Sequence, residues 1–157
     1  MSTIPGWIEL VNKYYQMGFL LSRASWSMSR KIHRLLGMRG IEEVSTGFIG
    51  VLFALYESNG RNITELGEAV ALEKSTMTGL LDRMESAGLV KREPDPEDRR
   101  AWRIKLTDRG KNIEGDIRKV VEEAYNQLTA GLTDKEGELV KKVLERIIEN
   151  SRNGAEE

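Results

Sequence analysis

The sequence contains no cysteine and only one histidine, and these absences exclude several classes of function. Without cysteine there can be no disulfide framework, thiolate zinc site, cysteine nucleophile or thiol-based redox sensor. A single histidine excludes a metal site with several imidazole ligands, although carboxylates alone could still hold a hard cation. We therefore expect neither a metal nor a cofactor.

Long hydrophobic runs are also missing, since no apolar stretch approaches the roughly 18 residues that a membrane span needs. The segment Met1–Trp7 lacks the basic and apolar regions of a signal peptide. With 157 residues and 39% apolar content, the chain is expected to be a cytoplasmic globular protein of one domain, with or without a helical extension. An enzyme is not favoured, because there is no glycine-rich phosphate loop, no nucleophile placed with the histidine and no carboxylate pair in an apolar cleft.

Charge of one sign is not in excess, because 24 basic residues face 25 acidic ones. The balance varies along the chain, with a net charge of +5 over residues 1–40 and −4 over residues 112–157. Ordinary solvated helix faces would account equally well for the net charge of each end. The clearer signal is a run of basic residues late in the middle segment. Its members are Arg99, Arg100, Arg103, Lys105 and Arg109.

The first 40 residues have the periodicity of one long helix that starts near Thr3–Pro5 and ends at Gly37–Gly40. One apolar stripe repeats at alternating steps of four and three, and a second stripe lies on a neighbouring face. A helix with two apolar faces must be sandwiched, and a partner subunit is the expected second layer. The first stripe is Trp7, Val11, Tyr14, Gly18, Leu21, Ser25, Met28, Ile32 and Leu35, and the second is Ile8, Tyr15, Phe19 and Trp26.

The middle of the chain predicts a helix-turn-helix followed by a β-hairpin. An apolar helix over 44–58 precedes a capping box at Asn62–Glu65, and the helix that this box opens is followed by a tight turn and a second helix. The period then changes from 3.6 to 2, which predicts two strands and a turn between them. The second helix is expected at 75–87 with Met77, Leu80, Leu81 and Met84 buried, the strands at 89–93 and 101–106, and the turn at 94–98.

Two further helices are expected after the hairpin. Thr107 caps one whose apolar stripe runs from Ile113 to Leu128 and which ends at Gly131, and a capping box at Thr133–Glu136 opens the last, which frays after residue 150. The predicted fold is therefore mainly α with a small β-hairpin (α+β). A winged helix-turn-helix domain at 41–111 is flanked by an N-terminal dimerisation helix at 1–40 and C-terminal dimerisation helices at 112–157.

The outer face of the second helix predicts DNA recognition. The face carries Ser75, Thr76, Thr78, Gly79 and Arg83. Small residues, most of them hydroxylated, stand at its N-terminal end, and they let a helix enter a major groove and form hydrogen bonds to base edges. A solvated helix face is the alternative, but lysine and glutamate are better helix formers at such positions. At the hairpin tip, an arginine of Asp98-Arg99-Arg100 could enter a minor groove, with the aspartate holding it extended. A surface ion pair is the alternative there.

These motifs together resemble the MarR family of transcriptional regulators. The matching segments fall within residues 62–111, and the order of the flanking helices agrees over the whole chain. They are Ile63-Thr64-Glu65-Leu66-Gly67, the run from Ser75 to Arg92 that contains Leu81-Asp82-Arg83-Met84-Glu85-Ser86-Ala87-Gly88-Leu89-Val90, then Asp95-Pro96-Glu97-Asp98-Arg99-Arg100, and Leu106-Thr107-Asp108-Arg109-Gly110.

The resemblance implies a homodimer whose N- and C-terminal helices interlock, and a repressor that binds a pseudo-palindromic operator in double-stranded DNA. The recognition helix would enter the major groove through Ser75, Thr76, Thr78, Gly79 and Arg83. The wing would enter the minor groove through Asp98, Arg99 and Arg100. The sequence departs from the family at Gly79, where many members carry a larger, often basic side chain, so one contact is expected to be missing.

Many family members release DNA when a small, often aromatic and anionic molecule binds between the dimerisation helices and the winged domain. In this chain the candidate residues are Arg23, Trp26, His33 and Phe48, with Phe19 and Tyr56 nearby, and Arg23 or His33 could meet a carboxylate. Core packing of the aromatic residues and surface or dimer contacts of the other two remain the alternative. The branches of the family that sense oxidants through cysteine, or bind metal through histidine, glutamate and cysteine, do not fit a chain with no cysteine and one histidine.

A second function class stays open, namely a protein-interaction adaptor on a winged-helix scaffold. Arg99 and Arg100 at the hairpin tip favour DNA, because an adaptor would not need them. A steep loss of binding with salt would distinguish the two, since binding to DNA releases counterions.

Overall fold

The computed structural model describes residues 13–98 and 100–153. The chain separates into two compact units, Met1–Ala124 and Tyr125–Glu157, which are described one at a time. None of the helices in the described part of the chain combines the length and apolarity needed to cross a membrane.

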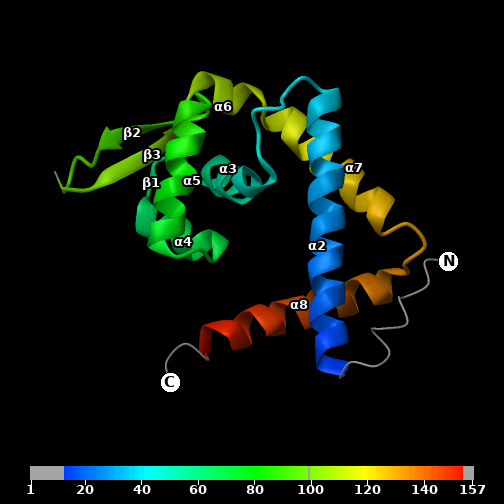
Figure 1. Cartoon of the computed structure of the whole chain (residues 1–157). Helices are drawn as coiled ribbons and strands as arrows, with labels where there is room; N and C mark the ends of the chain where they lie inside the picture. Colours follow the sequence, from blue (N-terminus) through cyan, green and yellow to red (C-terminus); the bar gives the residue numbers. More distant parts are fainter. Residues whose placement is uncertain (1–12, 99, 154–157) are drawn as a thin grey trace. The chain divides into compact units, whose positions relative to one another are not determined.

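The first unit contains most of the helices and the sheet, and its elements can be followed by colour and label (Figure 1). The order of elements is α2 (Lys13–Met38), the 3₁₀ helix η1 (Thr46–Phe48), α3 (Ile49–Glu57), β1 (Arg61–Asn62), α4 (Ile63–Val70), α5 (Lys74–Ser86), β2 (Val90–Pro94), β3 (Trp102–Leu106), α6 (Asp108–Asn112) and α7 (Glu114–Leu128). Helix α7 continues into the second unit, which also holds α8 (Asp134–Asn153).

The predicted fold class is confirmed, because the chain is mainly helical with a small antiparallel sheet. The sheet has three strands in the order β1-β3-β2, whereas the sequence predicted only a two-stranded hairpin. The missed strand β1 pairs Arg61 with Ile104 and Asn62 with Arg103. Two residues are too few to show the alternation by which a strand is recognised. Pro94, which was predicted to lie in the turn, instead ends β2 opposite Trp102.

The helix-turn-helix is set by local sequence. The predicted capping box at the start of α4 is confirmed, with the Asn62 side chain accepting from the backbone N–H of Glu65 and the Glu65 carboxylate accepting from that of Asn62. The turn that follows requires glycine at position 67, because a Cβ there would lie 2.8 Å from the carbonyl oxygen of Leu72. That close approach brings the backbone of the turn directly against α4.

Two of the expected helices each consist of two separate parts. The helix expected to run unbroken from Thr107 to Leu128 is divided into α6 and α7, with Ile113 in a turn between them. Thr107 does cap α6, since its hydroxyl accepts from the N–H of Gly110 at 3.0 Å. The helix expected over 44–58 begins with the 3₁₀ turn η1 before α3. The expected start of the first helix at Thr3–Pro5 lies outside the described residues.

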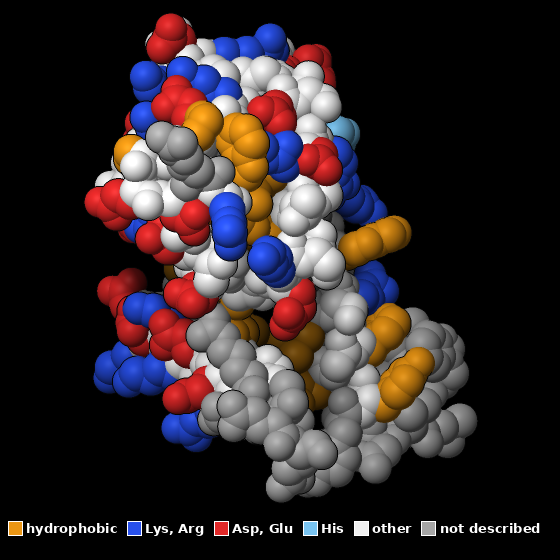
Figure 2. Space-filling model, turned by 90° about the vertical axis from the view of Figure 1, so that its left-hand side faces the viewer, with side chains coloured by type: hydrophobic (Ala, Val, Ile, Leu, Met, Phe, Trp, Pro, Cys, Tyr) orange, Lys and Arg blue, Asp and Glu red, His pale blue; other side chains and the backbone are white. Residues whose placement is uncertain are grey.

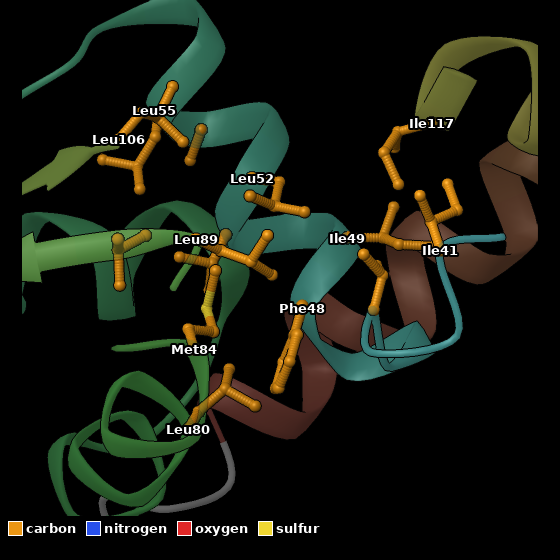
Figure 3. Packing of buried hydrophobic residues seen from close by; sticks show 14 of the residues in the cluster. Ile41, Phe48, Ile49, Leu52, Leu55, Leu80, Met84, Leu89, Leu106 and Ile117 are labelled. Carbon is orange, nitrogen blue, oxygen red and sulfur yellow. The ribbon is translucent and has the colours of Figure 1, made fainter. Parts of the chain in front are cut away.

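The core of the first unit lies between α3, α5, the sheet and the start of α7 (Figure 3). All four residues predicted on the inner face of α5 are buried, and Phe48 packs in the same cluster, near Leu80 and Met84. Among the side chains of α2 that the structure describes, the buried apolar ones lie in its last turns, at Ile32, Leu35 and Leu36. Earlier on α2, Trp26 is 72% exposed, so much of its apolar surface is uncovered within this chain.

In the second unit, α8 begins at the predicted capping box, where the N–H of Thr133 donates to the Glu136 carboxylate at 2.8 Å. The apolar side of this helix is exposed. The residues concerned are Leu139, Val140, Val143, Leu144 and Ile148, together with Leu132 just before the helix.

Candidate nucleic-acid interface

Helix α5 presents the predicted recognition residues together. Its inner face is held in the core, and the opposite face exposes Ser75, Thr76, Thr78, Gly79 and Arg83. The helix starts at Lys74, one residue earlier than expected, after Glu73, whose side chain provides no cap. The first N–H groups of α5 therefore have no side-chain partner and remain available to an anion such as a phosphate.

Hydrogen bonds within α5 determine which polar groups of two of these side chains remain available to a ligand. The Thr78 hydroxyl donates to the carbonyl of Lys74 at 2.9 Å, which leaves its oxygen lone pairs and its methyl group for another molecule. The Nε–H of Arg83 donates to the carbonyl of Gly79 at 3.3 Å. Arg83 is thereby laid along the helix, with its terminal nitrogens able to reach a base edge or a phosphate.

Gly79 is not needed for packing. A Cβ built at this position would find no atom within 4 Å, and the residue is exposed. The position therefore has room for the larger side chain that many family members carry there.

The loop at the wing tip is organised by Asp95, which is only 7% exposed. One carboxylate oxygen accepts from the backbone N–H groups of Glu97 at 2.8 Å and Asp98 at 3.4 Å. The other accepts from Nε of Arg103 at 2.8 Å. The backbone bond from Glu97 is the main cause that lowers the pKa of Asp95, followed by the positive charge of Arg103, so this carboxylate stays ionised.

Asp98 acts on the backbone of the tip. Its carboxylate accepts from the N–H of Arg100 at 2.9 Å, whereas the sequence suggested that it would align an arginine side chain. Arg100 is exposed, and its guanidinium forms no ion pair with any described residue. It is therefore available to a ligand outside the chain. Arg99, the third predicted wing residue, lies outside the described residues.

The other basic residues of the run from Arg99 to Arg109 are engaged within the protein. Arg103 binds Asp95 and also donates to the carbonyl of Gly60 at 3.1 Å. Lys105 pairs with Glu93 at 2.6 Å, and Arg109 pairs with Glu43. Most of this basic run is thus already paired within the protein. The sequence could not separate these roles, because the partners become neighbours only through the sheet and the packing of α6.

Glu93 lies between two lysines on one face of the sheet. Hydrogen bonds from Lys105 and then Lys91 lower the pKa of Glu93 to about 2. Figure 2, which views the molecule from the side where the β2–β3 hairpin ends in Figure 1, shows acidic and basic side chains interspersed rather than gathered into one basic field. Binding of DNA at this side would therefore depend on particular contacts more than on overall attraction.

The sequence analysis did not identify Arg92 as a residue that links the wing to α5. Its guanidinium contacts Asp82 and Glu85 of α5 at 2.6 Å each, and its backbone N–H donates to Glu85 at 3.2 Å. A signal was present in the alternation of the strand, because Arg92 shares the inward face with Val90. A charged residue at such a position needs a partner.

The four predicted effector residues are not brought together. His33 lines a shallow hollow with residues of α2 and of the segment before α3, while Phe48 is 4% exposed and belongs to the core. Trp26 is on the open surface of α2, and Arg23 lies 5.7 Å from the ring centre of Phe19. The hollow beside His33 is lined by Ser29, Arg30, Glu42, Glu43, Val44, Ser45 and Thr46.

No cluster of three or more metal-ligating side chains occurs among the residues that the structure describes.

The arrangement is that of a winged helix-turn-helix protein. It has a helix, a turn, a second helix with an exposed polar face, and a β-hairpin with an available arginine at its tip.

Comparison with known proteins identifies the family. The family model described as "MarR family" matches residues 49–102. The HTH-type transcriptional regulator SarZ of Staphylococcus epidermidis is 33% identical over 112 residues, which cover 71% of this chain and 74% of that protein. The chain therefore belongs to the MarR family of transcriptional regulators, whose members are not enzymes.

Solved structures agree with this assignment. A MarR transcriptional regulator from Methanosarcina mazei Go1 superimposes with a TM-score of 0.73 at 25% identity, covering 88% of this chain and 98% of the other. Overoxidized AbfR bound to DNA gives a TM-score of 0.70 at 26% identity, covering 87% of this chain and 93% of the other.

Proposed function

We propose that this protein is a homodimeric repressor that binds a pseudo-palindromic operator, with α5 in the major groove and the β2–β3 wing in the minor groove of each half-site. The observation that carries the proposal is the exposed outer face of α5, together with an exposed Arg100 at the wing tip whose guanidinium pairs with no described residue. On α5, Ser75, Thr76, Thr78, Gly79 and Arg83 would contact DNA, and on the wing Asp98, Arg99 and Arg100. A structurally similar protein, AbfR, has been crystallised bound to DNA, which supports DNA as the partner of this chain.

Dimerisation is supported by apolar surface that each unit leaves uncovered. Tyr15 and Trp26 on α2 are 57% and 72% exposed, and Leu139 on α8 is 62% exposed. A monomer does not usually leave so much apolar surface to water. A second copy of the chain that covers it would place two recognition helices about 34 Å apart, one turn of B-DNA.

The proposal includes a small-molecule effector. It is a small aromatic or anionic molecule whose binding releases DNA. Arg23, Trp26, His33 and Phe48 were the predicted residues, and the hollow beside His33 offers both Arg30 and hydroxyl groups to a carboxylate. Benzoate serves as a first probe, and it should raise the melting temperature of the protein and lower its affinity for DNA.

The alternative is an adaptor that binds another protein through the same surface. No contact among the described residues favours this alternative, and it does not account for the exposed Arg100 at the wing tip.

The deciding experiment is selection from a randomised duplex pool at near-physiological salt, followed by sequencing of the retained DNA. Two half-sites one helical turn apart in the retained DNA would support a dimer that binds a specific sequence. If no sequence is enriched, the selection is repeated after the protein has been unfolded and refolded without ligand. Continued failure would refute the proposal in favour of the adaptor.

A further inference from the structure

The β2–β3 hairpin leaves the body of the protein at Arg92. Opposite residues of the two strands share a face, so Val90 and Leu106, then Arg92 and Ile104, then Pro94 and Trp102 form three successive pairs. The first pair is buried, and Ile104 is fully buried. At the third pair, Pro94 is exposed and Trp102 is 47% exposed. Arg92 is thus the last residue of β2 on this face that is held by the rest of the protein.

Arg92 is held by the recognition helix itself. Its NH1 and NH2 groups contact Glu85 and Asp82, each at 2.6 Å, and its side chain is only 23% exposed. The two carboxylates are three residues apart on one side of α5, where like charges repel each other. The fork of a guanidinium can neutralise both at once, which a single ammonium group cannot do. Arg92 therefore joins β2 to one defined stretch of α5.

A small change at this point would be magnified at the wing tip. A strand advances about 3.3 Å per residue, so the tip lies about 15 Å beyond Arg92. A rotation of about 10° at Arg92 would move the tip by about 3 Å, roughly the whole length of a hydrogen bond. Strand β3 is also restrained on its far side by β1, whereas β2 is an edge strand with no described strand on its outer side. The contact between Arg92 and α5 is what restrains that edge.

We infer that Arg92 is a positioning residue that fixes the angle between the recognition helix and the wing, so that the two enter neighbouring grooves of DNA together. This inference rests on the proposed function. The two carboxylates are 59% and 39% exposed, and pairs of that exposure add little to stability. The role of Arg92 is accordingly expected to show in the coupling between wing and helix during DNA binding more than in the melting temperature.

The test is a double-mutant comparison on a duplex obtained by the selection described above. Arg100→Ala is measured by fluorescence anisotropy in the wild-type protein, in Arg92→Gln and in Lys91→Gln. Lys91 is the matched control, because it is the adjacent residue on the opposite face of β2 and its change removes the same charge. Circular dichroism establishes that each variant is folded at the assay temperature.

We expect Arg100→Ala to weaken binding about tenfold in the wild type and in Lys91→Gln, but less than about twofold in Arg92→Gln, where the wing no longer reaches its groove. An equal loss in all three backgrounds would overturn the inference. If Arg92→Gln does not fold, Arg92→Lys replaces it. Because lysine binds only one of the two carboxylates at a time, the expected loss is then about threefold, and a full tenfold loss would overturn the inference.

The outcomes separate this inference from the function on which it rests. If the wild-type protein binds no duplex, the proposed DNA-binding function is refuted. If it binds and the effect of Arg100→Ala does not depend on Arg92, only the positioning role is refuted.

Discussion

Asp95 and Arg103 pair at 2.8 Å across the base of the wing loop, and the same aspartate holds the loop backbone through the N–H of Glu97. We expect Asp95→Asn to lower affinity for DNA roughly tenfold, because an amide cannot satisfy both the arginine and the two backbone donors. Anisotropy titrations would measure this. Glu97→Gln is the control, since the Glu97 side chain takes no part in these bonds, and an equal loss in both variants would contradict the role of Asp95.

The lowered pKa of Asp95 adds a dependence on pH. In the unfolded chain this carboxyl titrates near its ordinary value of 3.8, and in the folded protein it titrates lower. The stabilisation is therefore complete above that value and is lost as the pH falls through the lowered pKa. Thermal melts of the wild type and of Asp95→Asn should differ at neutral pH and converge in acid. A constant difference down to pH 2 would contradict this assignment.

Two glycines should respond to alanine in opposite directions. A Cβ on Gly110 would overlap the carbonyl oxygen of Leu89, so Gly110→Ala should destabilise the fold by about 2 kcal/mol or more. A Cβ on Gly79 meets nothing, so Gly79→Ala should stabilise the helix by about 1 kcal/mol. Urea unfolding would measure both.

The Tyr56 hydroxyl donates to the carbonyl of Gly110 at 3.0 Å, and this bond connects α3 to α6. Tyr56→Phe should cost about 1 kcal/mol of unfolding free energy. Burial raises the pKa of Tyr56 to about 12, from an ordinary value of 10.0. Since the raised pKa disfavours ionisation in the folded state, wild-type stability should fall as the pH rises from 10 to 12. Tyr56→Phe should show a smaller fall, and Tyr125→Phe, at an exposed position, should behave as the wild type.

Arg100→Ala should weaken DNA binding with little change in melting temperature, because its guanidinium has no described partner to lose. The slope of log affinity against log salt concentration should decrease in magnitude by about one if the arginine binds a phosphate. Identical binding by wild type and variant at all salt concentrations would show that the wing does not contact DNA.

Substitutions on α5 should change which sequence is bound more than how tightly DNA is bound overall. The Thr78 hydroxyl donates within the helix, so its methyl group and lone pairs are what a base would meet. Thr78→Val keeps the shape and the methyl group but removes the lone pairs. Sequencing of selected duplexes should show a changed preference at one or two positions for Thr78→Val, and similarly for Thr76→Ala. An unchanged operator in both variants would argue against base contacts from this part of α5.

The elements that the sequence predicts well are those specified by local signals. The capping boxes at Asn62–Glu65 and Thr133–Glu136 and the apolar spacing of α5 depend on residues within a few positions of each other, and the structure contains all three. Strand β1 was not predictable, because it exists only through its pairing with β3, about 40 residues later. The interruption at Ile113 was hidden because the apolar period continues across it.

The candidate site was predictable in outline but not in detail. Its exposed face on α5 follows from helical spacing alone. The roles of the arginines do not, because Arg103 finds Asp95 across the hairpin and Arg109 finds Glu43, which is 66 residues away. Sequence could count the basic residues of the wing, but only tertiary neighbours distinguish Arg100 from those already engaged.

The order of the sheet has a consequence for solubility. A projecting hairpin with a free edge strand offers backbone groups on which another chain can add a strand, and this is a common route to aggregation. Here the edge strand β2 ends in Pro94, which has no N–H to donate, and carries Lys91 and Glu93 before it. The opposite edge, β1, is only two residues long. Both edges are therefore poor templates, so the wing can extend into solvent without recruiting strands from neighbouring molecules.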